Sequence, residues 1–575
     1  ATLPVLMRQD VVANTPEAEQ IVVLPNEITL SFASGTSETE RAAILAENNL
    51  AIIRKLRFTK NRYLVRSLSA SGIEVLNVAN QLNGVAKIES ATPNFMQTLT
   101  KQQKVPSTDW TAKANLSDHK ILPMHWHLNS SFLKGCLDRR DNDSQPLTEY
   151  LQKCFEDSPL PQKANSQFRT DIRATEAWKN SQGGKGVVVA VMDSLIQWDH
   201  PDLINNIHQV DQVSDKLPGE VRGWDFVEDD PDPAISREEL TVIAPRFRDA
   251  FLLSDLQLRQ KYPQIVAEIQ EQYADYSPRE VVKSLRWRLS NRVAQEFHGT
   301  MVAGVVAAKP QQELGVIGVA PEAKILPVRV IGVNGSFSLA NYLEAIGYAA
   351  ARNVDIINFS LGSRLPSEAE VEVISEVLES NPELVIVASA GNHNEGAILF
   401  PAGIPGVIAV GATNIYGYRA SYSNYGVNEA FGQKLTLVAP GGDNTTPRPV
   451  GRILTTGGTW LEAFWQGIQE PGEWGDNLDS KGMYRWTQGT SFSTPAVAGA
   501  IALMKGEDRD RRLSREQIAQ ILQETATYQG LNLTENELNI YKERSPSLAK
   551  SARQYFFGSG LVNADAAVRE VKNLP

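Results

Sequence analysis

Cysteine is scarce in this sequence, because the 575 residues include only Cys136 and Cys154. A structural zinc site needs four ligands at characteristic spacings, so these two cysteines do not form one without added histidines. If both thiols are oxidised, the loop that they close stabilises the fold by about 3 kcal/mol in the chain-entropy model. Two free thiols are an equal alternative, and the sequence alone leaves the disulfide state open.

Long apolar runs and a surplus of basic residues are also missing. No run approaches the roughly 20 apolar residues of a membrane-spanning helix, so a membrane span is not expected. The 56 Lys and Arg residues face 67 Asp and Glu residues, which gives a formal net charge of −11. This balance argues against nucleic acid as a partner, because phosphate binding requires a basic surplus. Hard cations are more natural partners for such a chain.

The first residues also show no secretory-leader pattern. The sequence starts at Ala1, and no charged stretch followed by an apolar stretch comes after it. We therefore expect that any signal peptide was removed earlier or never existed. The compartment stays undetermined, with a periplasmic or secreted location favoured over the alternatives.

The first hundred residues predict a small module behind a flexible lead. Residues 1–19 show no hydrophobic periodicity, and we expect them to form a flexible N-terminal lead. Residues 20–100 predict strands and helices in the order β-α-β-β-α-β, which is typical of a compact α+β module with a ferredoxin-like fold. Its first helix opens with a capping-box pattern from Ser37 to Glu40. A polar linker with the cysteine-containing insertion follows at 101–170.

Residues 171–575 predict an α/β domain, because short apolar segments alternate with helical ones. The predicted strands cover 187–192, 325–330, 356–361, 385–390 and 407–410. Such alternation is typical of a parallel sheet with helices on both faces, and functional residues then lie at the carboxyl ends of the strands. Two insertions interrupt it, a helical one at about 236–295 and a tryptophan-rich one at about 443–486. We expect these tryptophans to fill a core.

Three short motifs contain residues of the types that catalyse reactions. Asp193 directly follows an apolar strand, His298 opens the segment His-Gly-Thr-Met-Val-Ala-Gly, and Ser491 lies in Gly-Thr-Ser-Phe-Ser-Thr-Pro. A serine hydroxyl attacks a carbonyl poorly unless a base removes its proton, and that base needs a buried carboxylate beside it. Asp, His and Ser supply these three parts. A helix cap would explain Asp193 or Ser491 singly, but not the three motifs together.

These motifs resemble those of the subtilisin-like serine peptidases, the subtilase family. The resemblance extends from about Asp171 to the segment Gly-Ser-Gly-Leu-Val-Asn-Ala at 558–564. It implies a subtilisin-like α/β fold and hydrolysis of peptide bonds. In this family pattern Ser491 is the nucleophile, His298 is the base, and Asp193 orients the base.

The same resemblance implies the remaining parts of the site. Asn392 ends the segment Ser-Ala-Gly-Asn and matches the family's side-chain donor to the oxyanion, with the N–H of Ser491 as the second donor. Ser360, Leu361 and Gly362 match the edge that pairs with an extended peptide, so proteins and peptides are the expected substrates.

The preference for the residue before the scissile bond, P1, is inferred from two branches of the family. Ser363, Arg364 and Leu365 stand where kexins carry paired acids, so strict dibasic specificity is not expected. The chain looks closest to the calcium-dependent proteases of cyanobacteria, which are trypsin-like, and this implies Arg or Lys at P1. Glu395 is the nearest carboxylate for such a pocket, and plain solvation is its equal alternative.

Calcium is the implied cofactor, in a structural role. Asp225, Asp230 and Asp232 have the spacing of a kexin-like calcium loop, and close carboxylates repel one another without a cation. An acidic surface loop is the alternative. A second family site would use Asp202, Gln312 and the backbone carbonyls of Leu314 and Val316. Asp118, ahead of His-Trp-His-Leu at 125–128, is a looser candidate.

The N-terminal module resembles a subtilase propeptide, which would act as an intramolecular inhibitor of a zymogen. Lys101, Lys104 and Lys113 are then candidate self-cleavage points, although solvation explains these lysines as well. The sequence thus predicts a calcium-dependent serine endopeptidase that works through an acyl-enzyme and processes itself. A catalytically silent scaffold and a serine hydrolase with Glu in place of His are the rival hypotheses, and the intact motifs argue against both.

Overall fold

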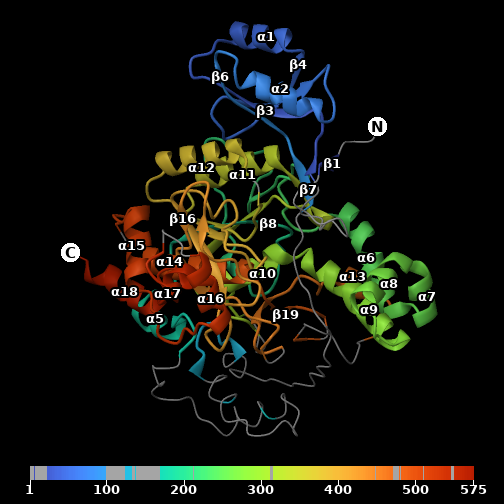
Figure 1. Cartoon of the computed structure of the whole chain (residues 1–575), viewed down its shortest axis with the longest axis vertical. Helices are drawn as coiled ribbons and strands as arrows, with labels where there is room; N and C mark the ends of the chain where they lie inside the picture. The colour runs from blue at the N-terminus through green and yellow to red at the C-terminus, as the bar shows by residue number, and fades with distance from the viewer. Residues whose placement is uncertain are drawn as a thin grey trace.

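The protein is seen in a computed structural model (Figure 1), which describes residues 5–6, 22–98, 124–131, 136, 150, 169–211, 213–310, 315–364, 366–446, 449–469, 478–479, 481–508, 510–544 and 549–574. Several residues singled out in the sequence lie outside these ranges: Lys101, Lys104, Lys113, Asp118, Cys154, Gln312, Leu314 and Leu365. Among the described residues, no helix combines the length and the hydrophobicity that crossing a membrane requires.

A seven-stranded sheet forms the centre of the molecule, in the order β17-β14-β13-β12-β8-β10-β9. Every neighbouring pair in it is parallel. Its strands are β8 (Val188–Asp193), β9 (Trp224–Asp225), β10 (Lys324–Arg329), β12 (Ile356–Phe359), β13 (Val385–Ser389), β14 (Val407–Thr413) and β17 (Leu437–Pro440). The predicted parallel α/β fold is confirmed, whereas the short edge strands β9 and β17 were not predicted.

Helices cover both faces of this sheet because its strands are apolar on both faces. On one face, Val189 and Val191 of β8 pack in a cluster with α5 (Ala174–Asn180), α10 (His298–Ala307), α14 (Thr490–Glu507), α15 (Arg515–Thr525) and α18 (Ala564–Asn573). On the other, Ala190 and Met192 pack with α11 (Leu339–Ala351), α12 (Glu368–Ser380) and α17 (Ala552–Phe557). Residues alternate between the faces along a strand, so β8 joins the two clusters.

The first residues form a separate α+β module. Its antiparallel sheet has the order β4-β5-β3-β6. The elements are β3 (Glu27–Phe32), α1 (Glu38–Glu47), β4 (Leu50–Lys55), β5 (Arg62–Ser67), α2 (Glu74–Leu82) and β6 (Ile88–Pro93). The capping box expected at the first helix is present, since Ser37 and Glu40 exchange side-chain and backbone hydrogen bonds.

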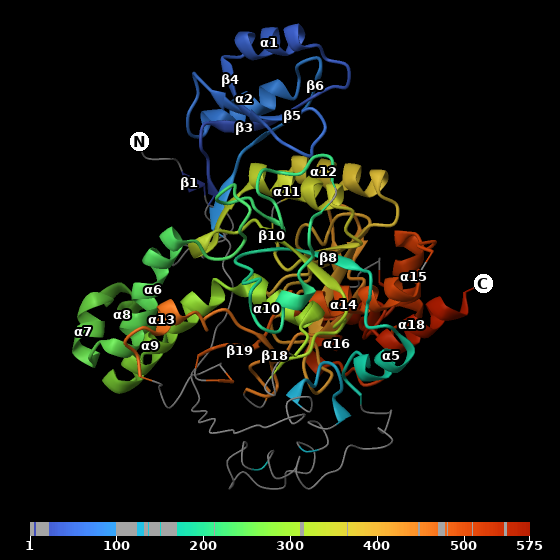
Figure 2. The ribbon, with the colours of Figure 1, turned by 180° about the vertical axis from the view of Figure 1, so that it is seen from behind.

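The module sits on α11 and α12, as both views show (Figures 1 and 2). Glu344 of α11 is fully buried there, and it accepts the backbone N–H of Arg57 at 2.9 Å and pairs with the guanidinium groups of Arg54 and Arg57. Buried Arg62 pairs with Glu372 of α12 at 2.7 Å. Asp229 also pairs with Arg57, so three carboxylates of the α/β domain hold three arginines of the module.

The strand that leaves the module continues this contact. β7 (Met96–Thr98) pairs antiparallel with β11 (Ser336–Ser338) of the α/β domain. Asn94, just before β7, accepts the backbone N–H of Ala340 at 3.0 Å. Because α11 has no side-chain cap of its own, Asn94 supplies the missing acceptor at its first turn.

Part of the predicted flexible lead belongs to the same sheet as β7 and β11. β1 (Val5–Leu6) pairs with β2 (Val22–Val23), and β2 pairs with β7, so the order is β1-β2-β7-β11. Residues 5 and 6, within the predicted flexible lead over 1–19, thus form a short strand. Two residues that pair with a neighbouring strand leave no periodic pattern in a sequence, which is why the strand was not predicted.

The insertion that precedes His298 is helical. It consists of α6 (Arg237–Leu252), α7 (Asp255–Lys261), α8 (Pro263–Gln272) and α9 (Pro278–Gln295), and it projects on the side of the molecule opposite α15 and α18 (Figures 1 and 2). The short α13 (Glu462–Trp465) of the second insertion packs against it, with the Phe247 and Trp465 rings 5.1 Å apart. Trp465 and Trp486 are both buried, so these two tryptophans fill a core as expected.

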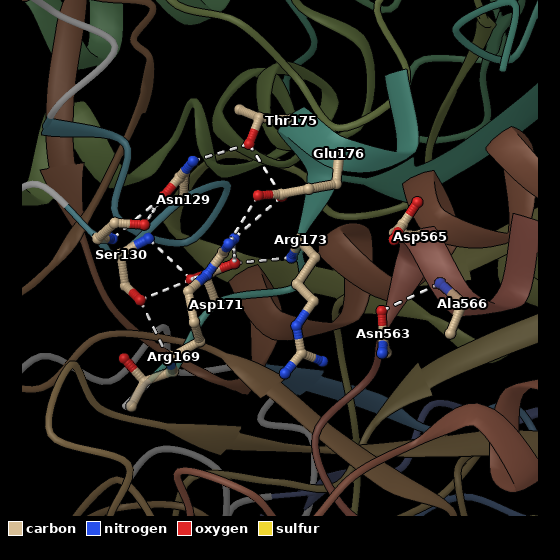
Figure 3. A network of polar contacts seen from close by, with 12 residues as sticks. Asn129, Ser130, Arg169, Asp171, Arg173, Thr175, Glu176, Asn563, Asp565 and Ala566 are labelled. Carbon is tan, nitrogen blue, oxygen red and sulfur yellow. Dashed lines mark hydrogen bonds and ion pairs between the residues drawn. The ribbon is translucent and has the colours of Figure 1, made fainter. Parts of the chain in front are cut away.

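A buried polar network ties the start of the α/β domain to an earlier segment (Figure 3). Arg169 pairs with Asp171 at 2.6 Å and with Glu176 of α5 at 2.7 Å. The Asp171 carboxylate also accepts the N–H of Ser130 at 2.8 Å, and Asn129 donates to Thr175 at 2.8 Å. Fully buried Asp171 thus has every charge and hydrogen bond matched, as a buried carboxylate requires.

The remaining elements are η4 (Ile204–Asn206), η5 (Val333–Gly335), β15 (Val427–Asn428), β16 (Gln433–Lys434), β18 (Ile453–Thr456), β19 (Tyr484–Thr487) and α16 (Glu535–Arg544). Cys136 is buried in the cluster of α10 and α14 and is disulfide-bonded. The sequence holds one other cysteine, Cys154. The alternative of a free thiol at Cys136 is therefore wrong.

Candidate active site

Asp193 and His298 meet at the carboxyl end of β8. Asp193 is the last residue of that strand and is fully buried. His298 is the first residue of α10, and its Nδ1 lies 2.8 Å and 2.9 Å from the two carboxylate oxygens of Asp193. The Asp193 carboxylate also accepts the N–H of Ser194 at 2.7 Å. These contacts fix the imidazole with Nδ1 as the donor, which leaves Nε2 as an acceptor.

A close approach of α10 to the end of β8 makes this contact possible. A Cβ at Gly299 would lie 2.7 Å from the carbonyl oxygen of Ser194, so only glycine fits after His298. The Ser194 hydroxyl accepts a hydrogen bond from the N–H of Gly299 at 3.2 Å and donates one to the carbonyl of Glu296 at 2.9 Å. The helical insertion therefore ends directly at the histidine and is tied to the residue beside Asp193.

Ser491 is the second residue of α14. It follows Gly489, whose φ of 141° suits glycine, and its hydroxyl donates to the carbonyl of Ser360 at 3.1 Å. Pro495 removes the N–H that would normally bond to the Ser491 carbonyl, and the Ser360 hydroxyl donates to that carbonyl instead, at 2.8 Å. The ring of the next residue, Phe492, lies 5.2 Å from the His298 ring. The nucleophile candidate is thus adjacent to the residue that contacts the imidazole.

Asn392 lies beside the same helix terminus. Its side-chain oxygen accepts the N–H of Thr490 at 2.9 Å and the Thr490 hydroxyl at 2.8 Å. Because that oxygen is used in this way, the amide NH₂ is directed away from Thr490 and is available to an acceptor. Asn392 and the N–H of Ser491 can therefore both donate to one oxygen atom in front of Ser491.

The predicted substrate segment lies between the nucleophile and the loop after β13. Ser360 is buried against Ser491, and the carbonyl of Leu361 accepts the Ser389 hydroxyl at 3.2 Å. The Leu399 side chain lies close to both Gly362 and Gly391. A Cβ on Gly362 would be 3.4 Å from the Cβ of Leu399, and one on Gly391 would be 2.7 Å from its Cγ. The apolar side chain of Leu399 therefore packs against Gly362 and Gly391.

Glu395 is already paired. Its two carboxylate oxygens lie 2.7 Å and 2.6 Å from Nη1 of Arg364, and both side chains are partly exposed. The sequence predicts Glu395 as a candidate pocket carboxylate and contains no sign that Arg364 neutralises it. A basic substrate side chain at Glu395 would have to displace Arg364.

The acidic loop at 225–232 does not have the form expected of a calcium site. Asp225 is buried and pairs with fully buried Arg329 at 2.7 Å, and Arg329 also pairs with Glu239 of the helical insertion. Burial raises the pKa of Asp225 to about 6, and the positive charge of Arg329 opposes that rise. Since a guanidinium already supplies the countercharge, this loop does not fit a resident calcium ion.

The other two predicted ligands in that loop accept hydrogen bonds from nearby N–H groups. Asp230 accepts the N–H of Asp232 at 2.8 Å, and Asp232 accepts the indole N–H of Trp198 at 2.8 Å. Within the described ranges, no three or more His, Cys, Asp or Glu side chains are arranged to hold a metal ion. Arg329 could not be found as the partner from the local sequence, because it lies 104 residues from Asp225.

Two residues of the second predicted calcium site can be described. Asp202 is buried, and one of its carboxylate oxygens accepts the N–H of Val316 at 2.9 Å. A Cβ at Gly315 would lie 3.2 Å from that oxygen. The carboxylate therefore lies against the loop that was expected to offer carbonyl ligands, and a cation at this site would share the carboxylate with the N–H of Val316. Asp118, Gln312 and Leu314 are outside the described residues.

Comparison with known proteins identifies the class. A sequence model of the subtilase family matches residues 184–560. Subtilisin Savinase of Lederbergia lenta is 33% identical over 272 residues, which cover 47% of this chain and 77% of that protein. A thermophilic serine proteinase of Bacillus sp. (strain AK1) is 27% identical over 355 residues, 61% of each chain. The alkaline protease of Shouchella clausii is 33% identical, and the match spans 55% of it.

Among solved structures, fervidolysin from Fervidobacterium pennivorans, a keratinolytic enzyme related to subtilisin, matches with a TM-score of 0.54. The match covers 95% of this chain and 61% of that one at 19% identity, so it bears on the fold alone. The match to the subtilase family model, in contrast, covers well over half of the chain. The chain belongs to the subtilase family, and this membership supports a serine endopeptidase.

Proposed function

We propose that the protein hydrolyses peptide bonds through an acyl-enzyme formed on Ser491, with His298 as the general base and Asp193 as its orienting carboxylate. The observation that carries this proposal is the bond from His298 Nδ1 to fully buried Asp193 at 2.8 Å. It leaves Nε2 as the basic nitrogen, on a ring that contacts the residue next to Ser491. A buried carboxylate also stabilises the imidazolium that forms when the ring takes up a proton.

The reaction follows from these roles. The Ser491 hydroxyl exchanges its bond to the Ser360 carbonyl for one to Nε2, gives up its proton there, and attacks the scissile carbonyl carbon. The carbonyl oxygen becomes an oxyanion, which receives hydrogen bonds from the amide of Asn392 and the N–H of Ser491. His298 then donates the proton to the leaving amine. A water molecule hydrolyses the ester in a second cycle of the same steps.

Basic residues at P1 are the proposed preference, with Glu395 as the countercharge. The family resemblance supports this proposal, whereas the pair with Arg364 and the apolar side chain of Leu399 limit it. A basic side chain would have to take the place of Arg364 at the carboxylate. Loss of the ion pair between Arg364 and Glu395 costs little stability, because exposed ion pairs contribute about 0–1 kcal/mol.

Product analysis tests both the activity and the preference. The full chain is incubated with a mixture of denatured proteins, and mass spectrometry identifies the new termini. We expect internal cleavage after Arg or Lys, and Glu395→Gln should reduce those cuts relative to all others. Cuts without Arg or Lys on the acyl side would refute the basic preference and keep the endopeptidase. An absence of new termini after the module has been removed would contradict the endopeptidase itself.

The N-terminal module is proposed to be an inhibitory propeptide. It is held to α11 and α12 by buried ion pairs, and β7 adds a strand to β11 of the α/β domain. An extended chain that pairs with an exposed strand edge imitates a bound peptide. Cleavage in the linker after β7, as in a zymogen, would then free the edge for substrates.

Glu344→Ala should loosen the module, because it removes the carboxylate that Arg54 and Arg57 share and leaves Arg54 only with Asn341 and Arg57 only with Asp229. Water screens Arg54 and Arg57, because each is about one third exposed. We therefore expect the equilibrium constant for docking of the module to fall about 10-fold. The measurement is the rate at which added trypsin cuts the module in the Ser491→Ala full chain, which cannot process itself. Glu379→Ala, an exposed change on the same side of the domain, is the control. Equal rates in both variants would contradict docking through Glu344.

Calcium is proposed as a structural ligand at the loop of Asp202 and Val316. A cation bound only by the folded state stabilises it by RT ln(1 + [Ca]/Kd), which is about 2.7 kcal/mol at a hundredfold excess over Kd. A chelator should therefore lower the Tm and the activity together, and added calcium should restore both. In Asp202→Asn the chelator should have no effect, whereas Asp230→Asn should respond as the unaltered chain does. Unchanged values in the unaltered chain would remove the metal from the account.

A further inference from the structure

The hydroxyl of Tyr422 lies at the turn that precedes the nucleophile. It accepts the N–H of Gly489 at 2.9 Å and donates to the carbonyls of Gly441 and Gly442, at 2.9 Å and 2.7 Å. Gly489 is the residue from which α14 begins, and Ser491 follows two positions later. The N–H of Gly489 also donates directly to the carbonyl of Gly441 at 3.0 Å, so the loop after β17 is joined to the backbone that presents the serine both directly and through the Tyr422 hydroxyl.

The segment that carries Tyr422 also holds the loop of Asn392. The backbone carbonyl of Tyr422 accepts the N–H of Asn394 at 2.7 Å. The Asn424 side chain accepts the N–H of His393 at 2.8 Å, and its backbone N–H donates to the carbonyl of Gly391 at 2.9 Å. Both neighbours of Asn392 in the chain are therefore bonded to residue 424.

This segment, residues 422–424, touches both sources of hydrogen bonds to the oxyanion. Tyr422 holds the turn that aims the N–H of Ser491, and Asn424 holds the loop that aims the amide of Asn392. A third contact connects the two sides directly, because Asn392 accepts the N–H and hydroxyl of Thr490. The two donors are therefore linked by short polar bridges rather than by packing alone.

We propose that Tyr422 is a positioning residue, whose hydroxyl fixes the turn at Gly489 so that the N–H of Ser491 and the amide of Asn392 converge on one oxyanion. The proposal rests on the proposed function, since it concerns the same reaction. Preorganised donors stabilise the transition state because they need no reorientation when charge develops. Misplacement of reacting groups by about 1 Å costs up to about 100-fold in rate.

The surroundings of Tyr422 keep this arrangement in place. Buried Asp443 accepts the N–H and the hydroxyl of Ser421, which anchors the chain immediately before Tyr422. Burial and the negative charge of Asp443 raise the pKa of Tyr422 well above its usual value. The hydroxyl therefore stays protonated over the working range and can donate to Gly441 and Gly442 while it accepts from Gly489.

Tyr422→Phe is the direct test, because it removes only the hydroxyl oxygen. We expect kcat for a peptide substrate to fall about 10-fold with KM little changed, since the ground-state peptide makes no use of the oxyanion donors. The affinity for a peptide aldehyde, which forms a tetrahedral adduct with the serine, should fall by the same factor as kcat. Tyr418→Phe, at an exposed tyrosine four residues earlier, should leave all three quantities unchanged.

A second background separates positioning from general structure. In Asn392→Ala one donor of the pair is already missing, so Tyr422→Phe should then lower kcat by much less than 10-fold. An equal loss in both backgrounds, or a loss that appears only as a lower Tm, would overturn the proposal. An unaltered chain without any activity would contradict the proposed function instead, and the two failures are therefore distinct.

Discussion

Ser491→Ala is expected to lower kcat for peptide hydrolysis by a factor on the order of 10⁶. The methyl group of alanine offers no nucleophile, so neither the attack on the carbonyl nor the acyl-enzyme can occur. The hydroxyl contributes one hydrogen bond to the fold, to the Ser360 carbonyl at 3.1 Å, and its removal costs about 1 kcal/mol. The variant should therefore remain folded, with a Tm close to that of the unaltered chain.

A matched control lies two residues further along the same helix. Ser493 is fully buried, and its hydroxyl donates to the carbonyl of Thr490 at 2.9 Å. Ser493→Ala thus removes a comparable hydrogen bond from α14 but no reacting group, and it should keep activity within about a factor of three. Peptide hydrolysis by Ser491→Ala at the rate of the control would assign the nucleophile to another residue.

Asp193→Asn is expected to lower kcat by about 10⁴ while the backbone stays in place. An asparagine amide can donate to Nδ1 of His298, which would place the proton on Nε2 and remove the base from the serine. It also removes the negative charge that stabilises the imidazolium. KM should change little, because Asp193 is fully buried and does not reach the substrate.

Two comparisons make this prediction specific. Asp199→Asn alters a neighbouring carboxylate that pairs with Gln197, away from His298, and it should leave kcat unchanged. Combined with Ser491→Ala, Asp193→Asn should cause no further loss, because residues that act as one unit are not additive. Additive losses would show that Asp193 acts independently of the serine.

Much of this site could be predicted because its parts are local in sequence. Asp193 ends an apolar strand, and His298 and Ser491 open helices rich in small residues, so each motif carries its own structural setting. In a parallel sheet the carboxyl ends of the strands lie at one edge, which explains why distant motifs meet. The bond between Asp193 and His298 follows from that geometry.

The partners of charged side chains could not be predicted in the same way. Arg329 neutralises Asp225, and Arg364 neutralises Glu395, yet neither arginine stands out in its own segment. An ion pair depends on where two distant backbones approach each other, and no periodicity reports that. The same holds for Tyr422, whose hydroxyl is informative only beside Gly489 and Gly441.

The position of the N-terminal module on the α/β domain could not be predicted from the sequence either. Its secondary structure follows from apolar spacing and from the capping box at Ser37, but its placement on α11 depends on Glu344 and on the pairing of β7 with β11. These contacts join residues that are more than 200 positions apart in the sequence. Local patterns therefore predict the parts of the module and leave its position open.

The central claim is that His298 activates Ser491, and covalent labelling with a fluorophosphonate tests it most directly. The reagent phosphonylates an activated serine hydroxyl, and peptide mapping by mass spectrometry identifies the modified residue. The account predicts one adduct, on Ser491, that is lost in Ser491→Ala and strongly reduced in His298→Ala. An unlabelled Ser491 in the chain freed of its module, or labelling that does not depend on His298, would contradict it.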